Sequence, residues 1–270
     1  MPSYEYPCPG PITIDVRNAA GVVEVRAEPR ETATVEVESY DDSEESREAA
    51  DRTRVELSGD TLLVATPELS GWLLRRTPRL RVTARVPADS SGRFRVASAD
   101  VTCHGEWAHV KVNTASGDAY LERAAGDLTV NSASGDVQAS YLGGRLTVKT
   151  ASGDVSARQV IGSVDIKSAS GDVHLDEAGG DVVIKTASGD TTVAAARRGT
   201  IRANTVSGDV SVGVVSGTGV WLDLNSLSGR TRSDLAMSGE TAPATHELTV
   251  QVGTISGNID VHRVTLPTAA

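Results

Sequence analysis

The sequence predicts an all-β protein, a parallel β-solenoid of the β-helix or β-roll kind, and three observations lead to this prediction. The tripeptide Ser-Gly-Asp returns every 18 residues, a second glycine falls half-way through each unit, and aliphatic and polar residues alternate between the glycines. Alternation with a period of two is typical of a half-buried β-strand. Each 18-residue unit is therefore expected to form one coil of two short strands that stacks on the next coil.

The Ser-Gly-Asp tripeptides are expected to form the corners of the coils. Glycine permits the positive φ that a tight corner needs, and an aspartate beside a turn accepts hydrogen bonds from nearby backbone N–H groups. The predicted structural turn residues are Gly117, Gly135, Gly153, Gly171, Gly189, Gly208, Asp118, Asp136, Asp154, Asp172, Asp190 and Asp209. Degenerate copies of the tripeptide follow around Gly229 and Gly257.

The residues between the corners predict which side chains face the interior. The half-way glycines, expected at the opposite corner, are Gly126, Gly144, Gly162 and Gly180. The predicted inward columns are Val137, Val155 and Val173 in one strand, Leu146, Val164 and Val182 in the other, and Ala133, Ala151, Ala169 and Ala187 at a tight corner. Thin aliphatic columns agree with an aromatic content of 3%. A glycine every nine positions argues against a helical repeat.

The chain is expected to form one continuous domain with three parts. Residues 1–95 predict a strand-rich N-terminal part that is continuous with the solenoid and holds one short helix at 42–54, where Asp42 and Glu45 have capping-box spacing. Residues 96–264 predict the solenoid of 18-residue repeats, and residues 265–270 predict a tail. The helix and the insertion at 230–246 are expected to cover open sheet edges.

Charge and composition narrow the classes of partner. The net charge of −10 disfavours nucleic acid, because an acidic chain repels the phosphate backbone. The basic cluster of Arg75, Arg76, Arg79 and Arg81 is interpreted as outward strand positions. The sequence has no run of 18 apolar residues and no secretion signal at its start, which predicts a cytoplasmic protein without a membrane span. The two cysteines lack metal-type spacing.

The aspartates at the corners are the first candidates for a ligand site. Stacking places them in a column with neighbours about 5 Å apart, a spacing at which like charges repel. Local hydrogen bonds within the turn are the favoured explanation, and calcium binding of the nonapeptide-repeat kind is the alternative. Arg145 and Ser163 stand where Asp127 and Asp181 stand in other half-units, so the calcium pattern fails. No metal site is predicted.

A second polar column follows one predicted strand. It comprises Asn113, Asn131, Lys149, Lys167, Lys185 and Asn204, next to Thr114, Ser132, Thr150, Ser168, Thr186 and Thr205. Stacked Asn and Thr side chains can hydrogen-bond to their own copies, and such a structural ladder is the favoured interpretation. The alternative is a flat polar face for a repetitive ligand such as a glycan. The possible binding face then comprises Asn131, Lys149, Lys167, Lys185 and Asn204.

No catalytic or cofactor-binding residue is predicted. The sequence has no nucleophile elbow, no P-loop and no dinucleotide fingerprint, and its histidines lack metal-ligand spacing. Carboxylate pairs for glycoside hydrolysis stay open, because the spacing singles out no pair. Trp107 is expected to seal an end or a corner, and a local contact surface with His104 and His109 is the alternative.

The repeated "TASGDV", the interleaved "AAGDLTV" and "AGGDVVI", and the lead-in "LRVTARVPADSSGRFRVASADVTC" carry a family resemblance. They resemble the bacterial putative-adhesin domain, known as domain of unknown function 4097. The segments "ITIDVRNAAGVVEVRAEPRETATVEVES" and "WLDLNSLSGRTRSDL" also resemble it, particularly forms found in actinobacteria. The resemblance covers nearly the whole chain. It implies a solenoid of β-strand repeats and brings no catalytic residues.

These features together predict a non-enzymatic structural or interaction module, an adhesin-like β-solenoid of unknown ligand. A polysaccharide-binding or polysaccharide-processing β-helix protein is the alternative, and a self-assembling filament subunit is the second alternative. The expected partner is an unknown protein or a glycan, with no nucleic acid and no cofactor. The chain is expected to be a monomer or a weak homo-oligomer.

Overall fold

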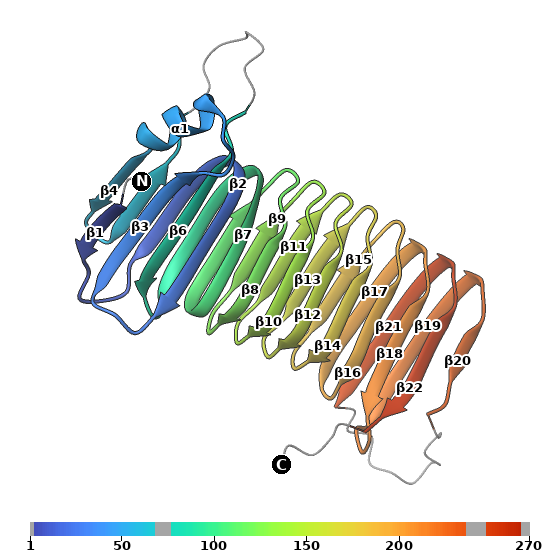
Figure 1. Ribbon diagram of the computed structural model, residues 1–270. Coiled ribbons are helices and arrows are strands. Elements are labelled where there is room, and N and C mark those ends of the chain that lie inside the picture. Colours follow the sequence, from blue (N-terminus) through green and yellow to red (C-terminus); the bar gives the residue numbers. More distant parts are fainter. Residues whose placement is uncertain (1–2, 68–76, 236–246, 266–270) are drawn as a thin grey trace. The chain divides into compact units, whose positions relative to one another are not determined.

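The computed structural model describes residues 3–67, 77–235 and 247–265, which divide into two units, residues 1–140 and 141–270. Each unit is built from β-strands that stack as coils (Figure 1), and α1 is the only helix in the described residues. The predicted fold class is confirmed: an all-β parallel solenoid with an irregular N-terminal part and one short helix. The predicted boundary between residues 95 and 96 stays a prediction.

Some predicted features fall on residues that the structure does not describe. Arg75 and Arg76 of the basic cluster, residues 236–246 of the C-terminal insertion and residues 266–270 of the tail lie outside the described ranges. Of the other two arginines, Arg81 lies at an outward position of β6 and Arg79 directly precedes that strand, and both stack on Tyr40. The guanidinium of Arg79 is 4.6 Å from the centre of the Tyr40 ring, and that of Arg81 is 5.4 Å from it.

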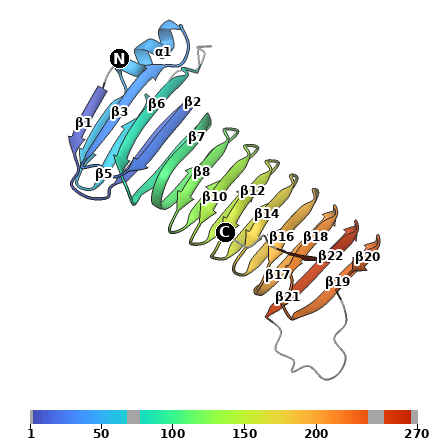
Figure 2. The same ribbon diagram turned by 60° about the horizontal axis from the view of Figure 1, so that its bottom comes forward.

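Unit 1 contains two strands, β2 and β7, that are long enough to form whole coils (Figure 2). Residues 13–27 of β2 pair in parallel with residues 91–105 of β7, so segments far apart in sequence become neighbours. The strands are β1 (Ser3–Pro7), β2 (Thr13–Glu28), β3 (Thr32–Ser39), β4 (Arg54–Ser58), β5 (Thr61–Ala65), β6 (Leu80–Pro87), β7 (Ser90–Asn113), β8 (Ala119–Ala124) and β9 (Leu128–Asn131), while β10 (Val137–Leu142) crosses the end of the unit. β1 pairs antiparallel with β3, β3 with β6, and β4 with β5. These antiparallel pairs make the N-terminal part irregular.

The predicted helix forms as α1 (Glu44–Asp51), a shorter element than the predicted 42–54. Ser43 is its N-cap, because the Ser43 hydroxyl accepts the backbone N–H of Ser46 at 3.2 Å. The predicted capping residue Asp42 is therefore wrong by one position. The small buried side chains Ser46, Ala49 and Ala50 allow α1 to lie close against β3 and β6.

Trp107 and Phe94 form the aromatic part of the core of unit 1. Both side chains are fully buried, their ring centres are 6.3 Å apart, and the rings meet edge to face. The indole N–H of Trp107 donates a hydrogen bond to the carbonyl oxygen of His104 at 3.0 Å. The alternative that Trp107 marks a contact surface is therefore wrong, since none of its side chain reaches solvent.

Unit 2 consists of two parallel ladders of strands. One ladder joins β11, β13, β15 and β17, and the other joins β12, β14, β16 and β18. Leu146 stands in register with Val164 and Val164 with Val182, as the repeat predicts, and all three are buried. The strands are β11 (Leu146–Thr150), β12 (Val155–Val160), β13 (Val164–Ser168), β14 (Val173–Ala178), β15 (Val182–Lys185), β16 (Thr191–Ala196), β17 (Gly199–Ser207), β18 (Val210–Val215), β19 (Val220–Ser228), β20 (Thr231–Ser233), β21 (Leu248–Ser256) and β22 (Ile259–Val264).

The prediction of an inward alanine column is wrong. The alanines concerned, Ala133, Ala151, Ala169 and Ala187, are exposed. In β11 the inward positions are Leu146, Val148 and Thr150, so the strand alternation runs one residue further than predicted and turns Ala151 outward. The buried corner residue before Ala151 and Ala187 is therefore a threonine, Thr150 or Thr186.

The last two coils are stacked in the reverse of their chain order. β21 pairs with both β17 and β19, so it lies between them, and β22 lies in the same way between β18 and β20 (Figure 1). The coil formed by β21 and β22 buries Val250, Val252 and Val261, whereas all three residues of β20 are exposed. The more aliphatic coil thus takes the inner position, and the more polar coil forms the end.

Candidate binding surfaces

The aspartates of the Ser-Gly-Asp corners hold consecutive coils together. In unit 1 the Asp118 carboxylate accepts the backbone N–H of Asp136 at 2.8 Å. In unit 2 the same contact, at 2.7 to 2.8 Å, repeats along the stack. The backbone N–H of Asp172 donates to Asp154, that of Asp190 to Asp172, that of Asp209 to Asp190 and that of Asn258 to Asp209. Each carboxylate thus accepts from a backbone N–H of the next coil in the stack, whereas the sequence predicted a donor within its own turn. We infer that these hydrogen bonds offset the repulsion within the column.

The corner glycines are required mainly by the close approach of the coils. Positive φ occurs at Gly171, Gly189 and Gly208, but Gly117 and Gly135 do not have it, so the predicted conformational reason holds only in part. A Cβ on Gly135 would lie 2.0 Å from the carbonyl oxygen of Gly117, far inside any normal contact. The coils therefore stack so closely at this corner that no side chain fits.

The Asp209 carboxylate gives a pH-dependent prediction. Hydrogen bonds from the backbone N–H and the side-chain amide of Asn258 hold the pKa of Asp209 below its ordinary value of 3.8. A carboxylate whose pKa is lowered by folding stabilises the folded state at pH values above its ordinary pKa. This contribution is lost as the pH falls below the ordinary pKa and through the lowered one. We expect Asp209→Asn to be less stable than the parent at pH 7, and the difference in denaturation midpoint to narrow as the pH falls from 7 to about 2.5.

Asp223→Asn is the control for this prediction. Asp223 is an exposed carboxylate of unit 2 that accepts only the side-chain amide of Asn225. Its replacement is expected to change the midpoint little at either pH. A gap for Asp209→Asn that stays constant from pH 7 to pH 2.5 would contradict the prediction.

The predicted binding face is a row of exposed cations on unit 2. Lys149 is in register with Lys167, Lys167 with Lys185, and Lys185 with Asn204. All four side chains are exposed, and within the described ranges the three ammonium groups form no hydrogen bond or ion pair. Asn131, the fifth predicted residue, belongs to unit 1, where its amide donates to the Asn113 Oδ1 at 3.0 Å.

The hydroxyl column beside this row has a local structural role. The hydroxyl oxygens of Thr114, Ser132 and Thr150 accept the backbone N–H of the corner glycine three residues later, at 2.8 to 3.0 Å. The hydroxyls of Ser168 and Thr186 instead donate to the backbone oxygen two residues later, at 3.0 Å. These side chains therefore shape the corners and do not hydrogen-bond to their own copies.

Unit 1 carries a second charged cluster that the sequence did not point to. The Asp15 carboxylate, which is only 5% exposed, accepts both its hydrogen bonds from Nη1 of Arg95 at 3.0 Å. Arg17 and Arg93 also lie within ion-pair distance of Asp15, at 3.7 and 3.8 Å. The local signal was the spacing of Asp15 from Arg17 and of Arg93 from Arg95, because residues two apart face the same side of a strand.

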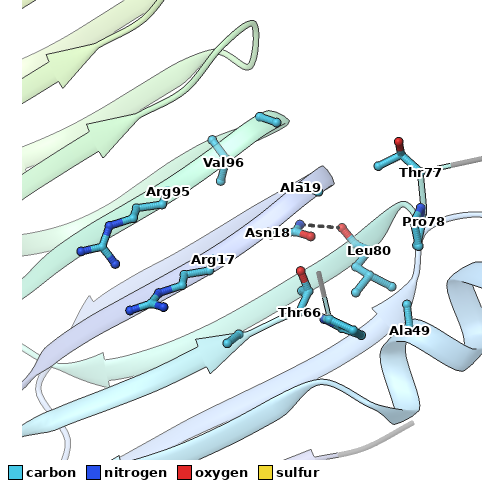
Figure 3. Close-up of a pocket in the computed structure, with 13 residues that line it drawn as sticks. Arg17, Asn18, Ala19, Ala49, Thr66, Thr77, Pro78, Leu80, Arg95 and Val96 are labelled. Atoms are coloured by element: carbon cyan, nitrogen blue, oxygen red, sulfur yellow. Dashed lines mark hydrogen bonds between the residues drawn. The ribbon is translucent and has the colours of Figure 1, made fainter. Parts of the chain in front are cut away.

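A hollow of about 820 Å³ lies next to this arginine cluster in unit 1 (Figure 3). The stems of Arg17 and Arg95 form part of its wall, and Leu80 and Val96 add apolar surface. Asn18 also lines the hollow, but its amide donates to the carbonyl oxygen of Leu80 at 3.3 Å. The hollow is therefore mostly apolar, with a cationic border.

The described residues lack a metal-binding cluster, and their two cysteines are not set up as reactive thiolates. Within residues 3–67, 77–235 and 247–265, no group of three or more His, Cys, Asp or Glu side chains is placed to hold a metal ion. Burial raises the pKa of the thiols of Cys8 and Cys103, which disfavours the reactive thiolate. The same ranges contain no helix with the length and apolar character to cross a membrane.

Stacked parallel coils with regular polar columns on their outer faces define the class of this protein: a parallel β-solenoid. The chain belongs to the Toastrack DUF4097 family, whose model matches residues 12–265. The comparison with curated proteins gives no match.

The chain is also similar to solved structures. A protein described as a putative lipid binding protein from Parabacteroides distasonis ATCC 8503 is 15% identical, with a TM-score of 0.53 over 97% of this chain and 96% of that chain. A protein described as a putative adhesin from Bacteroides fragilis NCTC 9343 is 13% identical, with a TM-score of 0.42 and the same coverage of the two chains. At 15% identity, the likeness to the protein from Parabacteroides distasonis concerns the fold alone.

Proposed function

We propose that this chain is a non-enzymatic binding module and that the row of Lys149, Lys167, Lys185 and Asn204 binds an acidic polysaccharide. One observation carries the proposal. Three of the four lysines in the sequence stand in register in this row, and none of the three has an anionic partner in the described part of the chain.

The arrangement of the row supports an anionic ligand. Neighbouring strands are about 4.8 Å apart, so the lysines project from adjacent positions, and two unit charges at this distance repel by roughly 0.8 kcal/mol in water. Like charges directly opposite each other on a sheet are destabilising. A chain of net charge −10 that gathers most of its lysines in one row therefore gains from a ligand that neutralises them.

The regularity of the row supports a repetitive ligand. The backbone register fixes the lysines along the stacking direction, so a linear polymer with repeated carboxylates can contact several at once. The alternatives of a protein partner, a polysaccharide-processing enzyme and a filament subunit stay predictions. The cytoplasmic location is likewise a prediction of the sequence.

Binding of polygalacturonate, with dextran as a neutral polymer, tests the proposal. We expect the protein to bind polygalacturonate and not dextran, with an affinity that falls as salt rises. The triple variant Lys149→Gln, Lys167→Gln and Lys185→Gln is expected to bind at least about tenfold more weakly, roughly the effect of losing 1.4 kcal/mol. Polygalacturonate recovered after incubation is expected to keep its length, as a non-enzymatic module requires.

The matched control removes three cations from elsewhere in unit 2. Arg158→Gln, Arg197→Gln and Arg232→Gln together change the net charge equally, and these arginines lie outside the row. This variant is expected to keep the parent affinity within about twofold, a change of roughly 0.4 kcal/mol. Equal losses in both triple variants, or no binding by the parent, would refute the proposed site.

A further inference from the structure

We propose a second binding site in unit 1, independent of the lysine row, that takes an amphiphilic anion. Arg17, Arg93 and Arg95 would hold a carboxylate or phosphate head, and the hollow that Arg17 and Arg95 line would hold an apolar chain.

The charge of the arginine cluster is not balanced by the protein. Three guanidinium groups surround one carboxylate, and within the described residues Asp15 is the only acidic partner of all three. The cluster therefore has an excess of two positive charges. The strand register also places Arg17 directly opposite Arg95, an unfavourable pairing of like charges.

The buried carboxylate leaves two arginines available. Asp15 receives its two hydrogen bonds from Arg95 alone, whereas Arg17 and Arg93 approach it only to 3.7 and 3.8 Å, beyond hydrogen-bond distance. Their side chains remain 52% and 47% exposed. Because a guanidinium presents its donors as a planar fork, these two groups suit a carboxylate or a phosphate.

The hollow supplies the apolar half of the site. Its volume of about 820 Å³ lies within the usual range for small-molecule pockets of roughly 300–1,000 Å³. Ala65, Pro78, Leu80 and Val96 line it, and the Asn18 amide is already hydrogen-bonded to the backbone. Figure 3 shows Arg17 and Arg95 lying side by side along one border, on β2 and β7. A ligand that filled the hollow would thus lie beside cations, which selects an anionic head on an apolar chain.

Titration calorimetry of the full chain with decanoate and decyl phosphate tests this site. At least one of the two is expected to bind at least about tenfold more tightly than decanol, acetate or inorganic phosphate, because each of these lacks one half of the ligand. The stronger of the two amphiphiles identifies the head group. If acetate or inorganic phosphate binds as tightly as the amphiphiles, or if neither amphiphile binds, the proposal is overturned.

Two matched variants assign the binding to the cluster. Arg17→Gln with Arg93→Gln leaves the Arg95–Asp15 pair intact and is expected to weaken amphiphile binding at least about tenfold. Arg54→Gln with Arg85→Gln removes two exposed arginines of unit 1 that pair with other carboxylates, and it is expected to bind as the parent does. Equal weakening in both variants would overturn the assignment. Retention of polygalacturonate binding by the first variant separates this site from the lysine row.

Discussion

Replacement of Trp107 by alanine is expected to lower the free energy of unfolding by about 3–5 kcal/mol, the usual range for removing a fully buried aromatic side chain. The variant would leave a cavity beside Phe94 and lose the edge-to-face contact between the two rings. It would also leave the carbonyl oxygen of His104 without its indole donor. Urea denaturation followed by circular dichroism measures the loss.

Trp221→Ala provides the control of the same residue type. Trp221 is on β19 and is 43% exposed, so the surrounding residues form no closed cavity around it. We expect Trp221→Ala to lower the free energy of unfolding by less than about 1 kcal/mol. If the two replacements cost the same, Trp107 is not the core residue that its burial indicates.

Gly135→Ala is expected to cost about 3 kcal/mol, at the upper end of the usual range for overpacking. The added methyl group would lie 2.0 Å from the carbonyl oxygen of Gly117, and relief requires the backbone of one coil to move away from the other. Because Gly135 does not have a positive φ, this variant isolates the effect of space from that of backbone strain. The free energy of unfolding in urea gives the measurement.

Gly10→Ala is the matched control for Gly135→Ala. A Cβ on Gly10 would meet no atom within 4 Å, and Gly10 does not have a positive φ. Both replacements restrict the unfolded chain to the same extent, so this contribution cancels in the comparison. We expect Gly10→Ala to change stability by less than about 0.5 kcal/mol, and a similar change at Gly135 would rule out the close approach.

The fold was predictable because the repeat encodes its own register. A spacing of 18 residues places Leu146 beside Val164 and Val182, and the structure has these pairs. The prediction for Ala151 was wrong by one strand position. Thr150 takes the inward position, where its hydroxyl accepts a hydrogen bond from the Gly153 backbone, and composition does not reveal this contact. The order of the last coils was not predictable from spacing, because it depends on which coil buries more apolar surface.

The candidate sites were predictable only where they follow the repeat. The lysine row appears in the sequence as one residue per coil at a constant position, so its members could be named in advance. The arginine cluster could not, because Asp15 and Arg95 are 80 residues apart and meet only through the pairing of β2 with β7. No periodicity connects these two strands, so their contact depends on the tertiary fold.

The reversed order of the last two coils has a consequence for a chain made from its N-terminus. Residues 220–233 are synthesised first and meet the free edge of β17 and β18 before residues 248–264 exist. Val220 and Leu222 can face the same edge, because they stand in register with Leu248 and Val250, although their strand buries less apolar surface. A coil that docked there first would have to be displaced by the one made afterwards, and the greater apolar burial of β21 favours that displacement.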